Sequence, residues 1–191
     1  SKVQPAGRAE ALPGCPGAGL LYPYGVFCPE CGDCGGQGSA GSGCLKERNF
    51  AGRENAELNG LSDRVRFLCR DVFELLPELE GAGETFDVVI LDPPAFTKSR
   101  SSVKNAVKGY REINMRGMKL CRDGGYLATC SCSRFMTYEL FTQTLSQAAR
   151  SVHKRLRQVE YRTQAPDHPV LWAAEESYYL KFYIFQVCEE K

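Results

Sequence analysis

An α/β fold, in which parallel strands are joined by crossover helices, is predicted for residues 53–191. Short apolar runs that suit buried strands alternate there with longer segments in which apolar residues recur at helical spacing. Turns rich in glycine, aspartate and proline separate these segments. In a sheet of this kind ligands bind at the carboxyl ends of the strands.

The first predicted elements are short. Glu54–Leu61 suits the end of a helix stopped by Gly60, and Val65–Cys69 suits a short strand. Val72–Leu79 repeats apolar residues at helical spacing, and Pro77 must kink or end that helix.

The middle of the chain predicts a strand, a long helix and another strand. Phe86–Leu91 is nearly all apolar, which is typical of a parallel strand covered on both faces. Val103–Cys121 is amphipathic and predicts a long helix. Asp123–Gly125 forms a turn before the strand Tyr126–Cys130.

The last part predicts one helix and two strands. Thr137 starts the helix, which runs to about Ser151. Leu156–Tyr161 and Tyr178–Val187 are the strands, and the second of them is rich in aromatic and β-branched residues.

Composition limits the partner and the compartment. The 191 residues carry a net charge of +1, so a nucleic-acid site must be a local basic patch. Neither an apolar run long enough for a membrane span nor an export signal is visible, so we expect a cytoplasmic protein with reduced cysteines and no membrane partner.

Residues 1–52 differ from the rest of the chain. They hold 12 of the 19 glycines and five of the ten cysteines, and they show no sustained hydrophobic period. The pattern predicts an irregular segment, Gly- and Cys-rich, followed by a second domain over residues 53–191.

The cysteines of the first segment suggest zinc as an alternative function. Cys28, Cys31 and Cys34, with Cys15 or Cys44 as a fourth ligand, could bind zinc through their thiolates. A zinc ribbon normally has two separated C-x-x-C pairs, and the second pair is missing. We therefore predict no metal site and keep a zinc-binding module as an alternative.

Chemically reactive side chains follow the predicted strands. Asp92 comes directly after an apolar strand, and Pro93 and Pro94 hold its backbone stiffly. Cys132 lies between two serines at the next strand end and is a candidate nucleophile, provided that a neighbouring cation or a helix amino terminus stabilises its thiolate. Cys130, inside an apolar run, is expected to be a core residue.

Several long motifs carry a resemblance to a known family. The runs FDVVILDPPAFTKSR, KGYREINMRGMKL, GGYLATCSCSRFMT and QAPDHPV, with a later YYLKF, stand in the order seen in that family. Residues 55–187 thereby resemble the S-adenosylmethionine-dependent methyltransferases that make 5-methylcytosine in large-subunit ribosomal RNA. The resemblance implies a Rossmann-like class I methyltransferase sheet, with S-adenosylmethionine as cofactor and ribosomal RNA as partner.

The family's site residues can be assigned to positions of this chain. By resemblance, Asp71 hydrogen-bonds the adenine amine of the cofactor and Val72 packs on the adenine ring. Asp92 of the DPP motif, with Pro93 and Pro94, lies between cofactor and target base, and Cys132 of the SCS motif is the nucleophile.

The chemistry explains these residue types. C5 of cytosine is a poor nucleophile, so a thiolate adds to C6 and pushes electron density to C5, which takes the methyl group. A carboxyl group at the N3 and N4 edge stabilises the charge that develops. The target base must leave its stack, which in RNA favours loops and single strands.

Methylation of an amino group is the closest chemical alternative. In amino-group methyltransferases with a DPP motif, an aromatic residue directly after the two prolines stacks on the base. Here that position is Ala95, and Phe96 stands one residue later. This spacing and Cys132 both favour methylation of carbon.

Basic residues follow the DPP motif and are candidates to bind the phosphate backbone of RNA. They are Lys98, Arg100, Lys104, Lys108 and Arg111. A solvated helix face is the alternative interpretation of each one.

Two family features are missing from residues 1–52. The family has a first strand with a glycine-containing turn, and then an acid that binds the ribose, about where Gly43 stands. The sheet is therefore expected to be incomplete, with its first strands missing or aberrant. One hypothesis for both features is that part of residues 1–52 was translated from a shifted reading frame.

The sequence thus predicts a methyltransferase that acts on C5 of a ribosomal cytosine. Loss of the first strands would impair the activity of this chain. A catalytically inactive remnant that binds RNA is the second alternative, beside the zinc-binding module. The sequence leaves the oligomeric state open.

Overall fold

The computed structural model describes residues 20–21, 54–55, 57–60, 62, 71–97, 99–174 and 177–190. The predicted strand Val65–Cys69 and all the cysteines proposed for zinc lie outside these residues. In the predicted first helix, Glu54, Asn55, Glu57 and Leu58 are helical. Gly60 follows with φ +64°, as expected of a residue that ends a helix.

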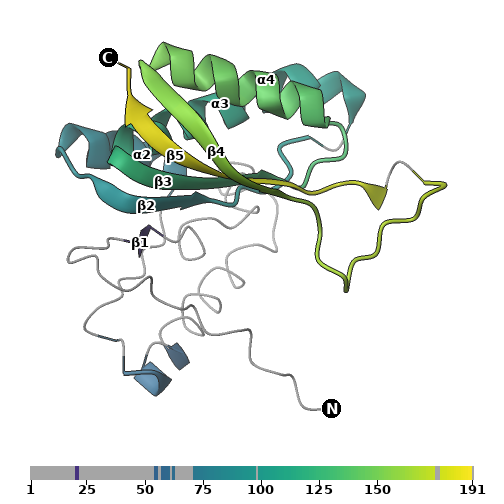
Figure 1. The fold of residues 1–191 in the computed structure, drawn as a ribbon, viewed down its shortest axis with the longest axis horizontal. Helices are drawn as coiled ribbons and strands as arrows, with labels where there is room; N and C mark the ends of the chain where they lie inside the picture. Colours follow the sequence, from purple (N-terminus) through teal and green to yellow (C-terminus); the bar gives the residue numbers. More distant parts are fainter. Residues whose placement is uncertain are drawn as a thin grey trace, which may run out of the picture.

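In the described residues, five strands form one mixed sheet in the order β1-β2-β3-β5-β4 (Figure 1). The strands are β1 (Leu20–Leu21), β2 (Phe86–Leu91), β3 (Cys121–Ser131), β4 (Lys154–Arg162) and β5 (Lys181–Glu189). β1, β2 and β3 are parallel, which confirms the α/β prediction for this half of the sheet.

One strand prediction needs correction. β5 runs antiparallel to both β3 and β4, so the sheet is mixed and not wholly parallel. β4 consequently points in the same direction as β3, and the helix between them is a crossover connection. β1 has two residues, which pair with Val88 and Val89 and lie within residues 1–52.

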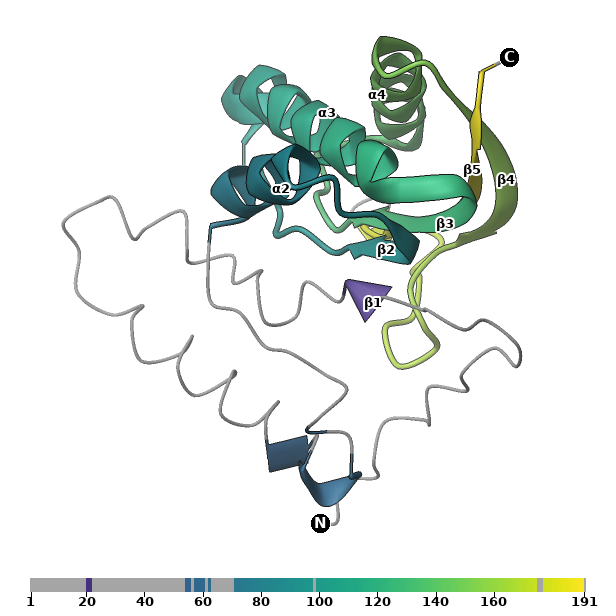
Figure 2. The ribbon, with the colours of Figure 1, turned by 90° about the vertical axis from the view of Figure 1, so that its left-hand side faces the viewer.

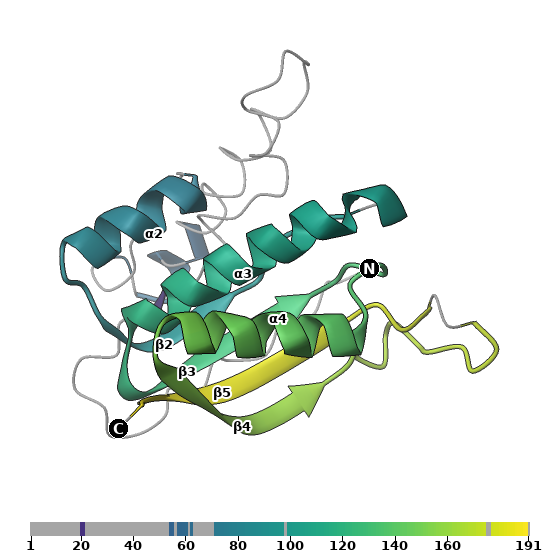
Figure 3. The same cartoon turned by 90° about the horizontal axis from the view of Figure 1, so that it is seen from above.

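Three of the helices in the described part of the chain lie together on one face of the sheet (Figure 2). They are α2 (Val72–Gly81), α3 (Val103–Leu120) and α4 (Tyr138–Ser151), and a short 3-10 helix, η3 (Arg100–Ser102), leads into α3. Seen from above, α3 lies beside α4 over the sheet (Figure 3). None of the described helices is long and apolar enough to cross a membrane.

The helix ends follow from their sequences. Asp71 caps α2, and its Oδ1 accepts a hydrogen bond from the Phe73 amide at 2.8 Å. Thr137 caps α4 as predicted, because its Oγ1 accepts a hydrogen bond from the Leu140 amide. Pro77 does not end α2, which runs on to Gly81.

The core lies between the sheet and its helix layer, in two clusters. One joins α2 and α3 to β2 and β3, with Leu76, Val89, Leu91, Ile113 and Leu127 among its buried members. The other is aromatic and joins α3 and α4 to β5, through Tyr110, Phe141, Tyr183 and Phe185. Phe96, just after the DPP motif, packs against both clusters.

The predicted turn Asp123–Gly125 lies inside β3. The pairing of β2 with β3 shifts register there, and Gly124 adopts φ +77°. A Cβ on Gly125 would come within 2.9 Å of the Asp87 carbonyl oxygen, so only glycine allows this approach of the two strands. β3 therefore begins five residues earlier than predicted, with a glycine bulge in place of the turn.

Candidate active site

Asp92 lies at the same edge of the sheet as Cys130 and, two residues later, Cys132 of the SCS motif. β2 and β3 are parallel neighbours in which Leu91 pairs with Thr129, so the residues that follow each strand come close together. The Cys130 thiol donates a hydrogen bond to Asp92 Oδ1 at 2.9 Å. Asp92 is exposed, whereas Cys130 is only 5% exposed.

Cys132 follows the end of β3 and is half-buried. Burial raises the pKa of its thiol, and the negative charge of Asp92 raises that pKa further. The charge of Lys181 acts in the opposite direction and lowers the pKa of Cys132. Cys132 therefore lies within electrostatic reach of one carboxylate and one ammonium group.

Cys130 differs from Cys132 in its surroundings. Burial and the neighbouring Asp92 together raise the pKa of the Cys130 thiol far above its ordinary value. The thiol therefore stays protonated and acts as a donor to Asp92. The prediction that Cys130 is buried is confirmed, but its contact with the carboxylate was not expected from an apolar run.

A small hydrogen-bond network fixes the two motifs to each other. Tyr110 on α3 donates its hydroxyl to the Pro94 carbonyl at 3.4 Å and accepts a bond from Ser131 Oγ at 2.9 Å. Ser133 Oγ donates to the Thr97 carbonyl at 2.8 Å. The DPP loop and the SCS turn are thus held in one geometry by buried groups.

Phe96 is partly buried and packs against both core clusters. Its ring meets Tyr110 edge-on at a centroid distance of 4.7 Å and lies 6.2 Å from the ring of Phe73. An aromatic residue with these neighbours anchors the DPP loop to the core. The position next to the prolines, Ala95, offers no ring, so the geometry does not favour the amino-group chemistry.

Lys181 is the main contributor to the site that the sequence reasoning missed. Its Nζ donates to the Ser133 carbonyl at 2.7 Å and to the Tyr179 carbonyl at 2.8 Å. The alternation of the strand could have indicated a buried lysine, because Lys181 occupies the same face as Tyr183, Phe185 and Val187. A lysine in a buried register of a strand is unusual and points to a specific partner.

The proposed cofactor-binding residues fit S-adenosylmethionine to different degrees. Asp71 is exposed and presents a carboxylate, although its Oδ1 also caps α2. Val72 is 5% exposed and packs within the first core cluster. Pro93 is buried, and Pro94 is half-buried beside Asp92. An exposed carboxylate is the acceptor that an adenine amine requires, so Asp71 fits its assigned role best.

The basic residues after the DPP motif are exposed where they are described. Arg100 precedes α3, and Lys104 and Lys108 lie along the helix. Arg111 donates from Nη2 to Ser151 Oγ at 2.8 Å, so its guanidinium also faces the end of α4. Lys98 lies outside the described residues.

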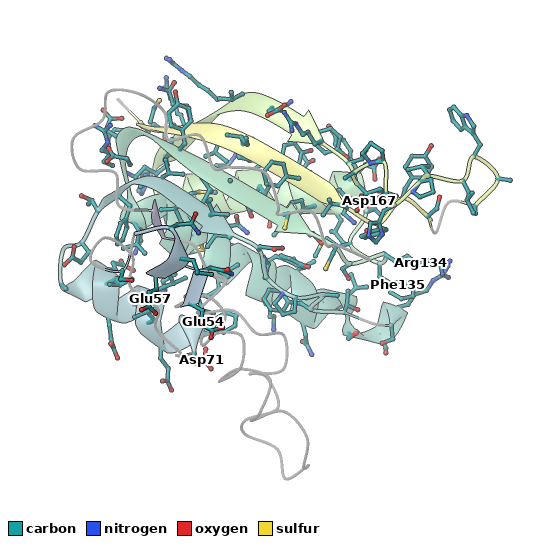
Figure 4. The ribbon with its side chains drawn as sticks, turned by 90° about the horizontal axis from the view of Figure 1, so that it is seen from below. Glu54, Glu57, Asp71, Arg134, Phe135 and Asp167 are labelled. Carbon is teal, nitrogen blue, oxygen red and sulfur yellow. The ribbon has the colours of Figure 1, made fainter. Side chains whose placement is uncertain are left out.

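Arg134 and Phe135 add a further basic and aromatic pair beyond the SCS turn. The guanidinium carbon of Arg134 lies 5.8 Å from the centroid of the Phe135 ring. Figure 4 shows both at the end of the molecule where Asp167 also lies. Among the described residues, no group of three histidine, cysteine or acidic side chains could hold a metal ion.

Comparison with known proteins tests the family. A family model described as S-adenosylmethionine-dependent methyltransferase matches residues 41–182. The chain belongs to this family. The family's description names S-adenosylmethionine, which is the cofactor that the resemblance implied. The expected class I fold agrees with membership of this family.

Two curated relatives are similar to much of the chain. Ribosomal RNA large subunit methyltransferase I of Shewanella denitrificans is 42% identical over 136 residues, 71% of this chain and 34% of the relative. The protein of the same name from Aeromonas salmonicida is 43% identical over 130 residues, 68% of this chain and 33% of the relative. The chain thus spans about a third of the length of these relatives.

A solved structure supports the fold. An S-adenosylmethionine-dependent methyltransferase from Streptococcus mutans superposes with a TM-score of 0.56 at 18% identity, covering 74% of this chain and 35% of that one. An incomplete Rossmann-like sheet with helices on one face is consistent with this partial match.

Proposed function

We propose that this methyltransferase-family chain transfers a methyl group to C5 of a cytosine in large-subunit ribosomal RNA, with Cys132 as nucleophile and Asp92 as its acidic partner. One observation supports the proposal most. Asp92 and the SCS turn lie close together at the ends of β2 and β3, where the Cys130 thiol donates a hydrogen bond of 2.9 Å to Asp92. The names of the curated relatives support ribosomal RNA as substrate.

The reaction begins with the Cys132 thiolate adding to C6 of the cytosine, which moves electron density to C5. S-adenosylmethionine, when bound, would supply the methyl group to C5 and leave as S-adenosylhomocysteine. Asp92 lies where a carboxyl group can bind the N3 and N4 edge and stabilise the developing charge. A base then takes the C5 proton, the C5–C6 double bond re-forms, and the sulfur–carbon bond to Cys132 breaks.

The cofactor is proposed to contact five residues at the strand ends. They are Asp71, Val72, Asp92, Pro93 and Pro94. Asp71 would accept a hydrogen bond from the adenine amine, and the DPP motif would separate the cofactor from the base. The stiffness of two successive prolines supports this role, because it keeps the Asp92 carboxyl oriented without either reactant.

The first prediction concerns removal of the proposed nucleophile and its partner. Cys132→Ser should lower methyl transfer to ribosomal RNA by about 10³-fold or more, as expected for loss of a nucleophile. Asp92→Asn should lower it by about 10²-fold to 10³-fold, through loss of charge stabilisation. The measurement is incorporation of labelled methyl from S-adenosylmethionine, with nuclease digestion to identify 5-methylcytosine.

Cys188→Ser is the matched control for this experiment. Cys188 is another half-buried free thiol, but it lies on β5 opposite Arg155 of β4 and away from the SCS turn. Its substitution should leave the rate unchanged. Full activity of Cys132→Ser would contradict the assignment of the nucleophile.

RNA binding without catalysis is the second candidate function, and the exposed row of Arg100, Lys104 and Lys108 favours it. It predicts salt-dependent RNA binding and no measurable affinity for S-adenosylmethionine. Calorimetric titration with the cofactor separates the two candidates. Binding would support the enzyme, and its absence beside intact RNA binding would support the remnant.

A further inference from the structure

Lys181 is a buried ammonium group without a carboxylate partner in the described part of the chain. It is 5% exposed and opens β5 on the face that continues through Tyr183, Phe185 and Val187. A buried charge is costly unless it is hydrogen-bonded or paired. Two carbonyl oxygens, of Ser133 and Tyr179, accept its protons at 2.7 and 2.8 Å.

These bonds place the ammonium group directly behind the SCS turn. Lys181 pairs with Ser131 in the register of β3 and β5, and its Nζ reaches past that pair to the carbonyl of Ser133. Cys132 stands between these two serines. A positive charge so placed is the kind of neighbour that a thiolate nucleophile needs.

The other titratable groups around Cys132 do not serve this purpose. Asp92 from the DPP loop is negative and opposes thiolate formation, as does burial. Cys130 stays protonated, and burial keeps the pKa of Tyr110 on α3 far above its ordinary value. Arg134, two residues after Cys132, lies over the Phe135 ring, and among the described groups Lys181 is the cation whose charge lowers the pKa of Cys132.

We propose that Lys181 is a positioning residue for Cys132, in which the ammonium group fixes the Ser133 carbonyl and supplies the positive charge that stabilises the Cys132 thiolate. This inference rests on the proposed role of Cys132 as nucleophile. It assigns to Lys181 no contact with substrate or cofactor.

The charge of Lys181 has a limited pH range. Burial lowers its pKa to about 8, although the nearby Cys132 and Cys130 raise it against that trend. Its stabilisation of the thiolate is therefore present below about pH 8 and is lost as the pH rises through that value. Each of the two groups stabilises the charged form of the other.

Alkylation of Cys132 tests this proposal without cofactor, RNA or turnover. The rate of reaction with iodoacetamide between pH 6 and 10, about the range of a thiol titration, reports the thiolate fraction. The tryptic peptide Asp123–Arg134 contains both Cys130 and Cys132, so fragment ions must separate the two sites. Lys181→Gln removes the charge and keeps a donor for the carbonyls, whereas Lys181→Arg keeps the charge.

Lys181→Gln should slow alkylation of Cys132 at about pH 7.5 by about tenfold or more, since an adjacent opposite charge shifts a pKa by one unit or more. Lys181→Arg should restore most of the rate. Lys119→Gln, a change to a lysine that pairs with Glu80 at the far end of α3, is the matched control and should react like the wild type.

An unchanged pH profile in Lys181→Gln would overturn the proposal, even if the variant unfolds at a lower temperature. If Lys181→Gln does not fold, the effect of Cys132 on the pKa of Lys181 tests the proposal in folded protein. The ¹³Cε resonance of Lys181, assigned from Lys181→Arg, should titrate at a lower pH in Cys132→Ser than in the wild type. An equal titration midpoint would overturn the proposal. Failure of methyl transfer with the expected alkylation profiles would disprove only the proposed function.

Discussion

Cys130 and Cys132 are two residues apart, yet their surroundings suit them to different tasks. The Cys130 thiol is buried, protonated and bonded to Asp92 Oδ1 at 2.9 Å. Cys132 is half-buried and senses the charge of Lys181. The first thiol is suited to orient a carboxylate, whereas burial and Asp92 raise the pKa of the second and Lys181 lowers it, so Cys132 is the more readily ionised of the two.

A prediction at Cys130 follows from this difference. Cys130→Ala should lower methyl transfer by about tenfold to a hundredfold, because a hydrogen bond to a charged group contributes about 1.5–3 kcal/mol. Cys130→Ser keeps a donor and should lose less. Steady-state rates at saturating RNA measure both. A loss in Cys130→Ala as complete as that in Cys132→Ser would make Cys130 the better candidate nucleophile.

At the scale of the element, α3 connects the core to the site. Its Tyr110 holds both the DPP loop and the SCS turn, and its buried Gly117 lies against Leu91 at the end of β2. A Cβ on Gly117 would stand 2.8 Å from Leu91 Cδ1. A Cβ at that position therefore forces the buried Leu91 side chain to shift.

Gly117→Ala should destabilise the fold by about 1–3 kcal/mol through overpacking against Leu91. The midpoint of urea unfolding measures the loss. Gly81→Ala is the matched control, because Gly81 ends α2 and no atom lies within 4 Å of its added Cβ. The control should change stability by less than about 1 kcal/mol, toward greater stability. Equal midpoints for both variants would refute the packing argument.

The exposed lysines of α3 carry a prediction about RNA. Lys104→Gln with Lys108→Gln should weaken binding to single-stranded ribosomal RNA segments and reduce the slope of log affinity against log salt by about 0.7 for each phosphate that is no longer neutralised. Filter binding at several salt concentrations measures the slope. Lys119→Gln on the same helix is the control, and an unchanged slope in the double variant would assign these lysines to a solvated face.

The sequence predicted the helices and strands well where hydrophobic periodicity was strong. β2 has the predicted bounds, and α4 begins after the predicted cap at Thr137. The direction of β5 was beyond such reasoning, because the 18 residues between Arg162 and Lys181 contain no short hairpin turn that would signal an antiparallel pair. The predicted start at Tyr178 was three residues early, since aromatic content alone extended the strand.

The candidate site was predictable in its residue types but not in its contacts. The position of Asp92 and Cys132 at neighbouring strand ends follows from parallel β2 and β3. The Cys130 contact required the register of β2 against β3. Lys181 comes from the antiparallel strand, whose placement beside β3 could not be deduced from sequence.

For the whole molecule, the family model matches residues 41–182, which include the candidate site. The chain spans about a third of the relatives' length, so their full activity is a proposal for this chain. We also propose that residues 1–52 form a separate irregular segment, part of it read in a shifted frame. The coding sequence and the intact mass of the natural protein test this hypothesis, and an uninterrupted frame would exclude it.

Trapping of the covalent adduct tests the central claim most directly. Large-subunit ribosomal RNA transcribed with 5-fluorocytidine has no C5 proton to lose, so the bond between Cys132 and C6 cannot break after methyl transfer. In the presence of S-adenosylmethionine we predict a protein–RNA adduct that survives denaturation and maps to Cys132. The adduct should form with Cys188→Ser and not with Cys132→Ser. An adduct mapped to Cys130, or RNA methylation without any adduct, would contradict the account.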